Sequence, residues 1–168
     1  MSLLGKSSTF APQFYFSTSD KMKEIIPIAS DHAGYELKQK VMKHLEQQGF
    51  EMKDYGTYSA ESCDYPDFAH PVGRDINKGT YKRGIVICGT GNGVQITVNK
   101  YPNVRCALCW VPELAQLARQ HNDANILSMP ARFIAEDTAL QVVDAYINTA
   151  FEGGRHQRRV EKINKLLD

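Results

Sequence analysis

The fold is predicted most clearly by one stretch, Gly84-Ile-Val-Ile-Cys-Gly-Thr-Gly-Asn-Gly-Val94. It begins with an unbroken apolar run, which is typical of a strand buried on both faces. Three glycines then alternate with other residues, and a helical pattern runs from Val94 to about Lys100. A strand, a glycine-rich turn and a helix in this order indicate an anion site, because the helix start offers unpaired N–H groups and a partial positive charge.

Cys88 stands at the carboxyl end of this strand, where open α/β sheets bind their ligands. A nearby helix N-terminus favours the thiolate, so Cys88 is a candidate base or nucleophile. A plainer interpretation makes Cys88 an ordinary core residue and lets the glycines only shape a turn. Because glycine-rich loops are common, both interpretations stay open on this stretch alone.

The composition is that of a soluble globular protein. The chain has 168 residues, of which 42% are hydrophobic and 23% charged, and its net charge is +1. Nothing in these values favours a nucleic-acid or membrane partner. Residues 1–22 lack periodicity and an apolar signal core, so we expect a disordered or leader extension followed by one domain over residues 23–168.

The four cysteines, Cys63, Cys88, Cys106 and Cys109, form no disulfide pattern, which favours a reducing, cytoplasmic location. Cys106 and Cys109 have the spacing of a metal or redox pair, but they lie in an expected strand. Residues three apart on a strand point to opposite faces, and no second Cys/His pair completes a site. We therefore expect no metal.

Five strand-then-helix units predict an α/β fold with a five-stranded parallel sheet, helices on both faces and an extra C-terminal helix. Right-handed crossovers would place the strand ends at one edge, which would collect Asp31, His32, Cys88, Thr90 and the loop with Arg132. Locally, Asp31 also fits a helix N-cap and His32 a solvent-facing loop. The strands are expected at 24–29, 50–55, 84–88, 104–109 and 124–128, and the helices at 35–48, 64–78, 94–100, 112–120, 136–148 and 155–167.

The last expected helix carries Arg155 and Arg159 four residues apart, on one face. Two arginines with no acid at matching spacing suit a phosphate, although a solvated basic face is the alternative. Val160, Ile163 and Leu167 form an apolar stripe on this helix, and we hypothesise that the stripe packs on a partner subunit.

Five segments in order resemble the type B ribose-5-phosphate isomerases of the RpiB/LacAB sugar-phosphate isomerase family, over roughly residues 24–164. They are Ser30-Asp-His-Ala-Gly34, Asp64-Tyr-Pro-Asp67, Cys88-Gly-Thr-Gly-Asn-Gly93, Arg119-Gln-His-Asn-Asp123 and Glu152-Gly-Gly-Arg-His-Gln157. The resemblance implies a Rossmann-like three-layer sandwich, a homodimer with sites at the subunit interface, no metal and no cofactor. It also implies interconversion of ribose 5-phosphate and ribulose 5-phosphate through an enediol, a step of the pentose phosphate pathway.

The resemblance assigns three catalytic residues: Cys88 as the base between C1 and C2, Thr90 as an assisting hydroxyl and His121 as the residue that opens the furanose ring. One branch of the family has a glutamate base at the position of Val94, and this chain fits the cysteine branch. Backbone N–H groups of the glycine loop can stabilise the enediolate. The substrate-binding residues it implies are Asp31, His32, Gly89, Gly91, Asn92, Gly93, Asn122, Arg132, Arg155 and Arg159.

Two other functions stay open. The same family includes isomerases of six-carbon sugar phosphates such as allose 6-phosphate and galactose 6-phosphate, and the sequence does not separate five from six carbons. The second function is that of a non-catalytic module, which holds a nucleotide or phosphate on the glycine loop. Such a binder needs neither a thiol at Cys88 nor a histidine at His121, which favours an enzyme.

Overall fold

The computed structural model describes residues 23–165. The expected leader, residues 1–22, and Leu167 of the apolar stripe lie outside the described residues. No helix within residues 23–165 combines the length and the apolar character needed to cross a membrane.

Five strands form one parallel sheet in the order β2-β1-β3-β5-β4, which confirms the predicted sheet. β4 lies at an edge although it precedes β5 in the chain. The central strands β3 and β5 are buried at every residue, as their apolar sequences predict. The strand bounds are β1 Ile25–Ser30, β2 Glu51–Asp54, β3 Gly84–Cys88, β4 Cys106–Leu108 and β5 Ile126–Pro130.

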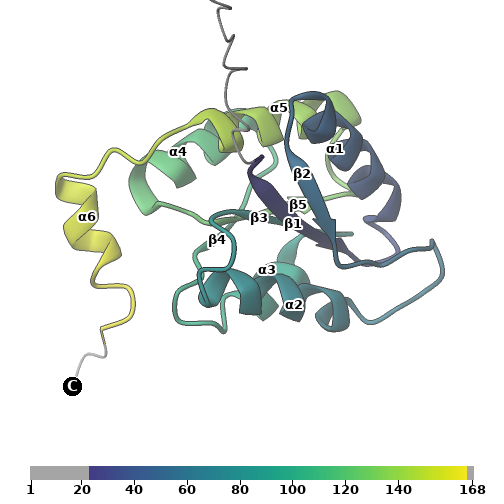
Figure 1. Ribbon diagram of the computed structural model, residues 1–168, viewed down its shortest axis with the longest axis horizontal. Helices are drawn as coiled ribbons and strands as arrows, with labels where there is room; N and C mark the ends of the chain where they lie inside the picture. The colour runs from purple at the N-terminus through teal and green to yellow at the C-terminus, as the bar shows by residue number, and fades with distance from the viewer. Residues whose placement is uncertain (1–22, 166–168) are drawn as a thin grey trace, which may run out of the picture.

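Helices cover both faces of the sheet and complete the predicted three-layer sandwich (Figure 1). α1, α4 and α5 pack together on one face, and α2 and α3 pack together on the other. α6 stands apart from both layers, at the end of an extended connection from α5. The helix bounds are α1 Tyr35–Gln47, α2 Tyr65–Asn77, α3 Asn92–Val98, α4 Pro112–Asn122, α5 Glu136–Asn148 and α6 Arg155–Val160.

The core has two parts, one under each helix layer. Cys106 belongs to one part and Cys109 to the other, so the two thiols lie on opposite sides of the sheet as their strand spacing predicts. Burial raises the pKa of Cys109 to about 12 and raises that of Cys106 as well. Both thiols are protonated core side chains at neutral pH.

Pro27 lies inside a central strand, where its missing N–H would normally cost a hydrogen bond. β1 pairs with β2 from Ile25, and its ladder with β3 starts only at Ile28. Tyr55 donates its N–H to the Ile28 carbonyl on the β2 side, so the alternate residue Pro27 faces β3, just before that ladder begins. The strand therefore tolerates the proline.

α6 ends at Val160, whereas the sequence pattern predicted a helix to residue 167. Residues 161–165 are all exposed, and His156 is the only buried residue of α6. A short helix that buries no apolar stripe gains little from extension, which explains the early end. Two glycines with positive φ, Gly153 at 66° and Gly154 at 55°, precede this helix.

Candidate active site

The candidate site lies at the carboxyl ends of β1 and β3, where the chain diverges to opposite faces of the sheet. β1 leads to α1 on one face, and β3 leads to α3 on the other. Open α/β sheets bind their ligands at such a switch point, and we call this place between the two loops the β1/β3 crevice. Gly34 lets these loops approach closely, since a Cβ there would lie 2.8 Å from the carbonyl oxygen of Ile87.

Cys88 is the last residue of β3, and only 4% of it is exposed. The backbone N–H of Gly91 donates to Cys88 Sγ at 3.1 Å. Gly91 has φ 75°, the left-handed conformation that glycine adopts without strain, and this conformation turns its N–H toward the sulfur. This bond holds the sulfur against the backbone donors of the glycine loop. Thr90 and Asn92 are exposed beside it.

The loop after β1 brings Asp31 and His32 to the same crevice. Asp31 Oδ1 accepts the N–H of Gly34 at 2.9 Å and so holds the turn that precedes α1. The N-cap residue of α1 is Gly34, so the local interpretation of Asp31 as the helix N-cap is wrong. His32 Nδ1 accepts the N–H of Cys63 at 3.3 Å. Because a backbone N–H can only donate, the neutral imidazole carries its proton on Nε2 and can donate from there to a ligand.

Arg132 reaches this crevice from the loop after β5. Its N–H donates to the carbonyl of Gly89 at 3.0 Å, and its Cδ would lie 3.3 Å from a Cβ on Gly89. The structure thus brings together nine of the predicted residues at one edge: Asp31, His32, Cys88, Gly89, Thr90, Gly91, Asn92, Gly93 and Arg132.

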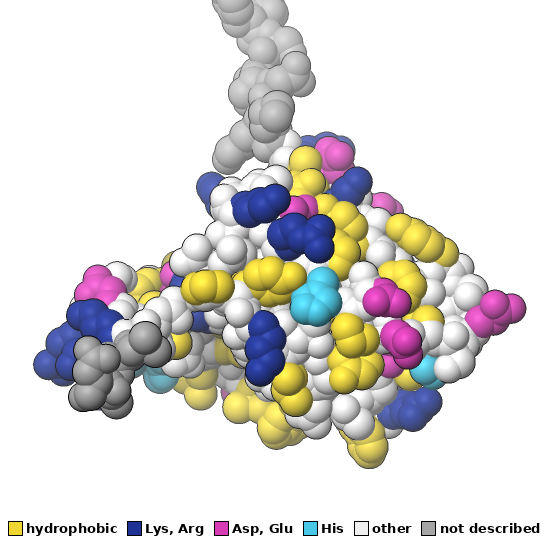
Figure 2. All heavy atoms as spheres, turned by 90° about the horizontal axis from the view of Figure 1, so that it is seen from below, with side chains coloured by type: hydrophobic (Ala, Val, Ile, Leu, Met, Phe, Trp, Pro, Cys, Tyr) yellow, Lys and Arg dark blue, Asp and Glu magenta, His cyan; other side chains and the backbone are white. Residues whose placement is uncertain are grey.

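The other four predicted residues lie elsewhere. His121 and Asn122 end α4, which runs back from the carboxyl edge of the sheet, so they lie at its amino edge beside the start of β5. Arg155 and Arg159 lie on α6, and Figure 2 shows Lys and Arg side chains gathered at that end of the molecule. Within one chain, these four residues and Cys88 are separated by the length of the strands.

His156 was missed by sequence reasoning, although the motif that contains it was recognised. Its ring stacks on that of His121, with centroids 4.3 Å apart and planes 7° apart, and it is 5% exposed. Desolvation, followed by the charges of His121 and Arg155, lowers the pKa of His156, while Glu152 opposes the shift. The lowered pKa favours the neutral form of His156, whose ring packs face to face on that of His121.

His121, Glu152 and His156 could also be considered as metal ligands, since their ligand atoms lie within 4.8 Å of one another. The lone pairs of an imidazole lie in its ring plane. Two stacked, nearly parallel rings cannot both direct lone pairs at one ion, and the Arg155 guanidinium donates to His156 Nε2 at 3.4 Å. The cluster does not fit a metal in this arrangement.

A family model described as Ribose/Galactose Isomerase matches residues 26–163 of this chain. The chain belongs to this family. The resemblance seen in the sequence motifs is thereby confirmed.

Relatives of this chain align over most of its length. Ribose-5-phosphate isomerase B of Escherichia coli (strain K12) is 43% identical over 141 residues, which are 84% of this chain and 95% of that protein. The ribose 5-phosphate isomerase structure from Thermotoga maritima has a TM-score of 0.83 at 49% identity and covers 85% of this chain and 99% of its own. Ribose-5-phosphate isomerase B from Mycoplasma genitalium, with bound ribulose-5-phosphate, has a TM-score of 0.81 at 43% identity, covering 85% and 95%.

Proposed function

We propose that this protein is an aldose–ketose isomerase that interconverts D-ribose 5-phosphate and D-ribulose 5-phosphate through an enediolate. The observation that carries the proposal is the buried Cys88 thiol, which receives the Gly91 N–H in the β1/β3 crevice. Family membership and the relative with bound ribulose-5-phosphate support the substrate class.

The reaction moves one proton between adjacent carbons, so it needs one base in a site with little water. Cys88 Sγ takes the proton from C2 of the open-chain aldose, and the same thiol returns it to C1. Negative charge then develops on the substrate oxygens. Backbone N–H groups of the 89–93 loop and the hydroxyl of Thr90 stabilise this charge, and one such donor is typically worth about 3 kcal/mol.

Ribose 5-phosphate is mostly a furanose, so the ring must open before the proton can move. His121 performs this step, because an imidazole can both give and take a proton near neutral pH. Asn122 holds the developing enediolate, and Arg155 and Arg159 bind the phosphate. Asp31, His32 and Arg132 bind and orient the sugar.

A second copy of the chain completes the site, since one chain holds Cys88 and His121 at opposite ends of its sheet. The proposed assembly is a homodimer in which each crevice receives the α4 end and α6 of the partner subunit. Large apolar side chains are exposed on the elements that would meet. Six of them lie in or beside α3, α4, β4, β5 and α6: Ile96, Trp110, Val111, Leu117, Phe133 and Ile163. Burying such residues drives association.

The proposed setting is the pentose phosphate pathway in the cytoplasm, with residues 23–168 as the isomerase domain. The four cysteines are free, as expected in a reducing compartment. The mechanism uses only side chains and backbone of the protein and requires neither metal nor cofactor.

A coupled assay for ribulose 5-phosphate formed from ribose 5-phosphate tests the proposal, with and without EDTA and beside Cys88→Ala. We expect turnover that survives EDTA and disappears in the variant, while the variant still binds ribulose 5-phosphate. A Cys88→Ala protein with near-normal kcat would remove the thiol from the mechanism. If the folded wild type is inactive, allose 6-phosphate and galactose 6-phosphate are the next substrates to assay. Absence of turnover with these two as well would favour a non-catalytic module that binds a nucleotide or phosphate.

A further inference from the structure

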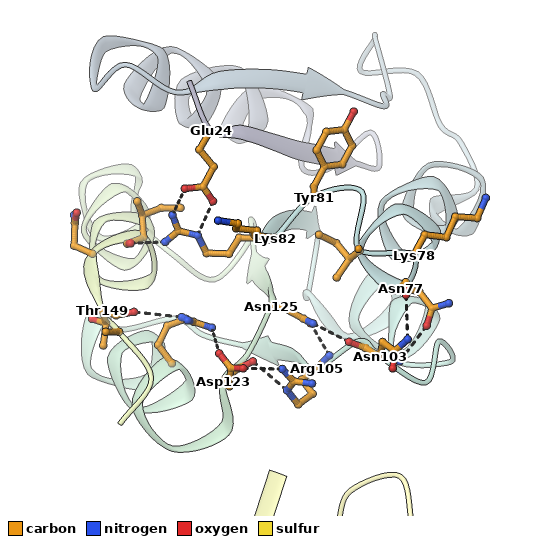
Figure 3. Close-up of a pocket in the computed structure, with 17 residues that line it drawn as sticks. Glu24, Asn77, Lys78, Tyr81, Lys82, Asn103, Arg105, Asp123, Asn125 and Thr149 are labelled. Atoms are coloured by element: carbon orange, nitrogen blue, oxygen red, sulfur yellow. Dashed lines mark hydrogen bonds and ion pairs between the residues drawn. The ribbon is translucent and has the colours of Figure 1, made fainter. Parts of the chain in front are cut away.

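A cavity of about 890 Å³ opens at the amino edge of the sheet, away from Cys88. Its walls are the segments that precede β1, β3, β4 and β5, together with the ends of α2 and α5 (Figure 3). Ligand pockets usually measure roughly 300–1,000 Å³, so the cavity has room for a molecule of nucleotide size.

The charged side chains of this cavity are mostly cationic. Its lining contains five cations, Lys78, Lys82, Arg83, Arg105 and Arg119, and two acids, Glu24 and Asp123. The walls of a hollow with excess positive charge concentrate the potential inside it and attract anions.

Arg83 is held by its neighbours through three hydrogen bonds. Its Nε and Nη2 donate to the two carboxylate oxygens of Glu24 at 3.0 and 2.6 Å, and its Nη1 donates to the carbonyl of Ile147. Glu24 therefore neutralises the charge of this guanidinium, and all three of its nitrogens already donate to the protein.

Arg105 and Arg119 share a single acid. Arg105 Nη2 lies 3.0 Å from Asp123 Oδ2, and Arg119 Nη1 lies 2.9 Å from Asp123 Oδ1. Among residues 23–165, Arg105 Nη1 and Arg119 Nη2 make no hydrogen bond. One positive charge and two NH2 groups therefore remain for an anion.

Lys82 adds an ammonium group that has no ion pair with any described residue. Figure 3 shows its side chain pointing toward Glu24, on the side of the cavity away from Asp123 and Arg105. Lys78 stands at the rim and extends outward in the same view. An anion with oxygens spread over more than one phosphate can meet both Lys82 and the Arg105–Arg119 pair.

We propose that this amino-edge cavity is a second anion site that binds an organic diphosphate of the class of a nucleoside diphosphate. The cations would hold the diphosphate. Tyr81, Ile76, Ile147 and Ala150 supply apolar lining for the organic part. The site is distinct from the proposed substrate-phosphate residues Arg155 and Arg159, which are not among the cavity's lining residues.

Isothermal titration calorimetry of the full-length protein with ADP in magnesium-free buffer tests this site directly. The Arg155→Ala/Arg159→Ala double variant removes the proposed substrate-phosphate site, and we expect ADP binding to persist in it. Adding Lys82→Glu should weaken binding at least about tenfold, because it reverses a charge that faces the phosphates. Inorganic pyrophosphate should bind at least about tenfold more weakly than ADP, since it lacks the organic part.

Lys43→Glu is the matched control, because Lys43 is exposed on α1 and makes the same change in net charge outside the cavity. It should alter affinity less than about twofold at physiological salt. The proposal is overturned by absence of binding at millimolar ADP, by loss of binding in the double arginine variant alone, or by equal effects of Lys43→Glu and Lys82→Glu. Equal affinities for ADP and pyrophosphate would overturn the assignment of an organic ligand. These readouts are binding constants, so they do not depend on the proposed isomerase activity.

Discussion

Two inactive variants of this protein, Cys88→Ala and His121→Asn, should restore activity when they are combined in one dimer. The first removes the proposed base and the second removes the imidazole proposed to open the ring. Cys88 ends β3, whereas His121 ends α4 at the other edge of the sheet. A strand of five residues spans about 15 Å, so one chain cannot bring the two side chains to one sugar.

The expected recovery follows from the symmetry of the proposed dimer. Random association of equal amounts gives about half hybrid dimers, and each hybrid has one site with both native residues and one site with neither. The mixture should therefore show about a quarter of the wild-type turnover of ribose 5-phosphate. If both residues came from the same chain, every site would lack one of them and no turnover would return.

The two variants are refolded together from denaturant, hybrid formation is confirmed by native mass spectrometry, and ribulose 5-phosphate production is followed. A mixture of Cys88→Ala and Arg132→Ala is the control, because both changes fall in the same half-site and no hybrid contains an intact site. If hybrid dimers form in the expected amount but are as inactive as the control mixture, the proposal of a site shared between two subunits is refuted.

Three further outcomes are expected. Gly34→Ala should lower the free energy of unfolding by about 1–3 kcal/mol in urea titrations, because its Cβ would press on the Ile87 carbonyl; an unchanged midpoint would show that the loops can separate freely. Arg159→Ala should raise KM for ribose 5-phosphate about tenfold and leave kcat nearly intact, as expected for loss of one charge-assisted phosphate contact; an unchanged KM would place the phosphate elsewhere. Folding lowers the pKa of His156, so the unfolded chain takes up its proton first, and stability should fall as the pH drops below about 6.5. The melting temperatures of wild type and His156→Gln should differ most above that pH, and the difference should shrink below it. A difference that does not change with pH would contradict the lowered pKa of His156.

The sheet and its helices were predictable from the sequence because the hydrophobic pattern of each segment indicates a strand or a helix. The run Ile85-Val-Ile87 is apolar without interruption, and it forms a strand buried on both faces. The order of the strands was not predictable in the same way, because the sequence of one strand does not show which other strands pair with it. β4 has only three residues and β5 is buried throughout, which is consistent with the shorter strand taking the edge.

The candidate site was predictable in part. Residues that end or follow strands, such as Cys88, Asp31 and Arg132, meet at one edge because parallel strands all end there. His121 lies in the last turn of α4, and a helix between parallel strands returns the chain to the opposite edge. Its separation from Cys88 is therefore a consequence of topology that the motifs, read one by one, do not express. The stacking of His156 on His121 depends on the position of α6 and has no signature in the spacing.

The two glycines before α6 have a consequence for how the enzyme can change over time. Gly153 and Gly154 hold backbone conformations with positive φ, which other residues adopt only with strain. They set the direction in which α6 leaves the body of the subunit, and hence the distance from Arg155 and Arg159 to any crevice. A change in the direction of α6 could therefore adapt the site to a substrate of another length. The residues proposed to perform the chemistry would stay unchanged. Substitutions at Gly153 or Gly154 would therefore change the position of the proposed phosphate-binding arginines without changing the arginines themselves.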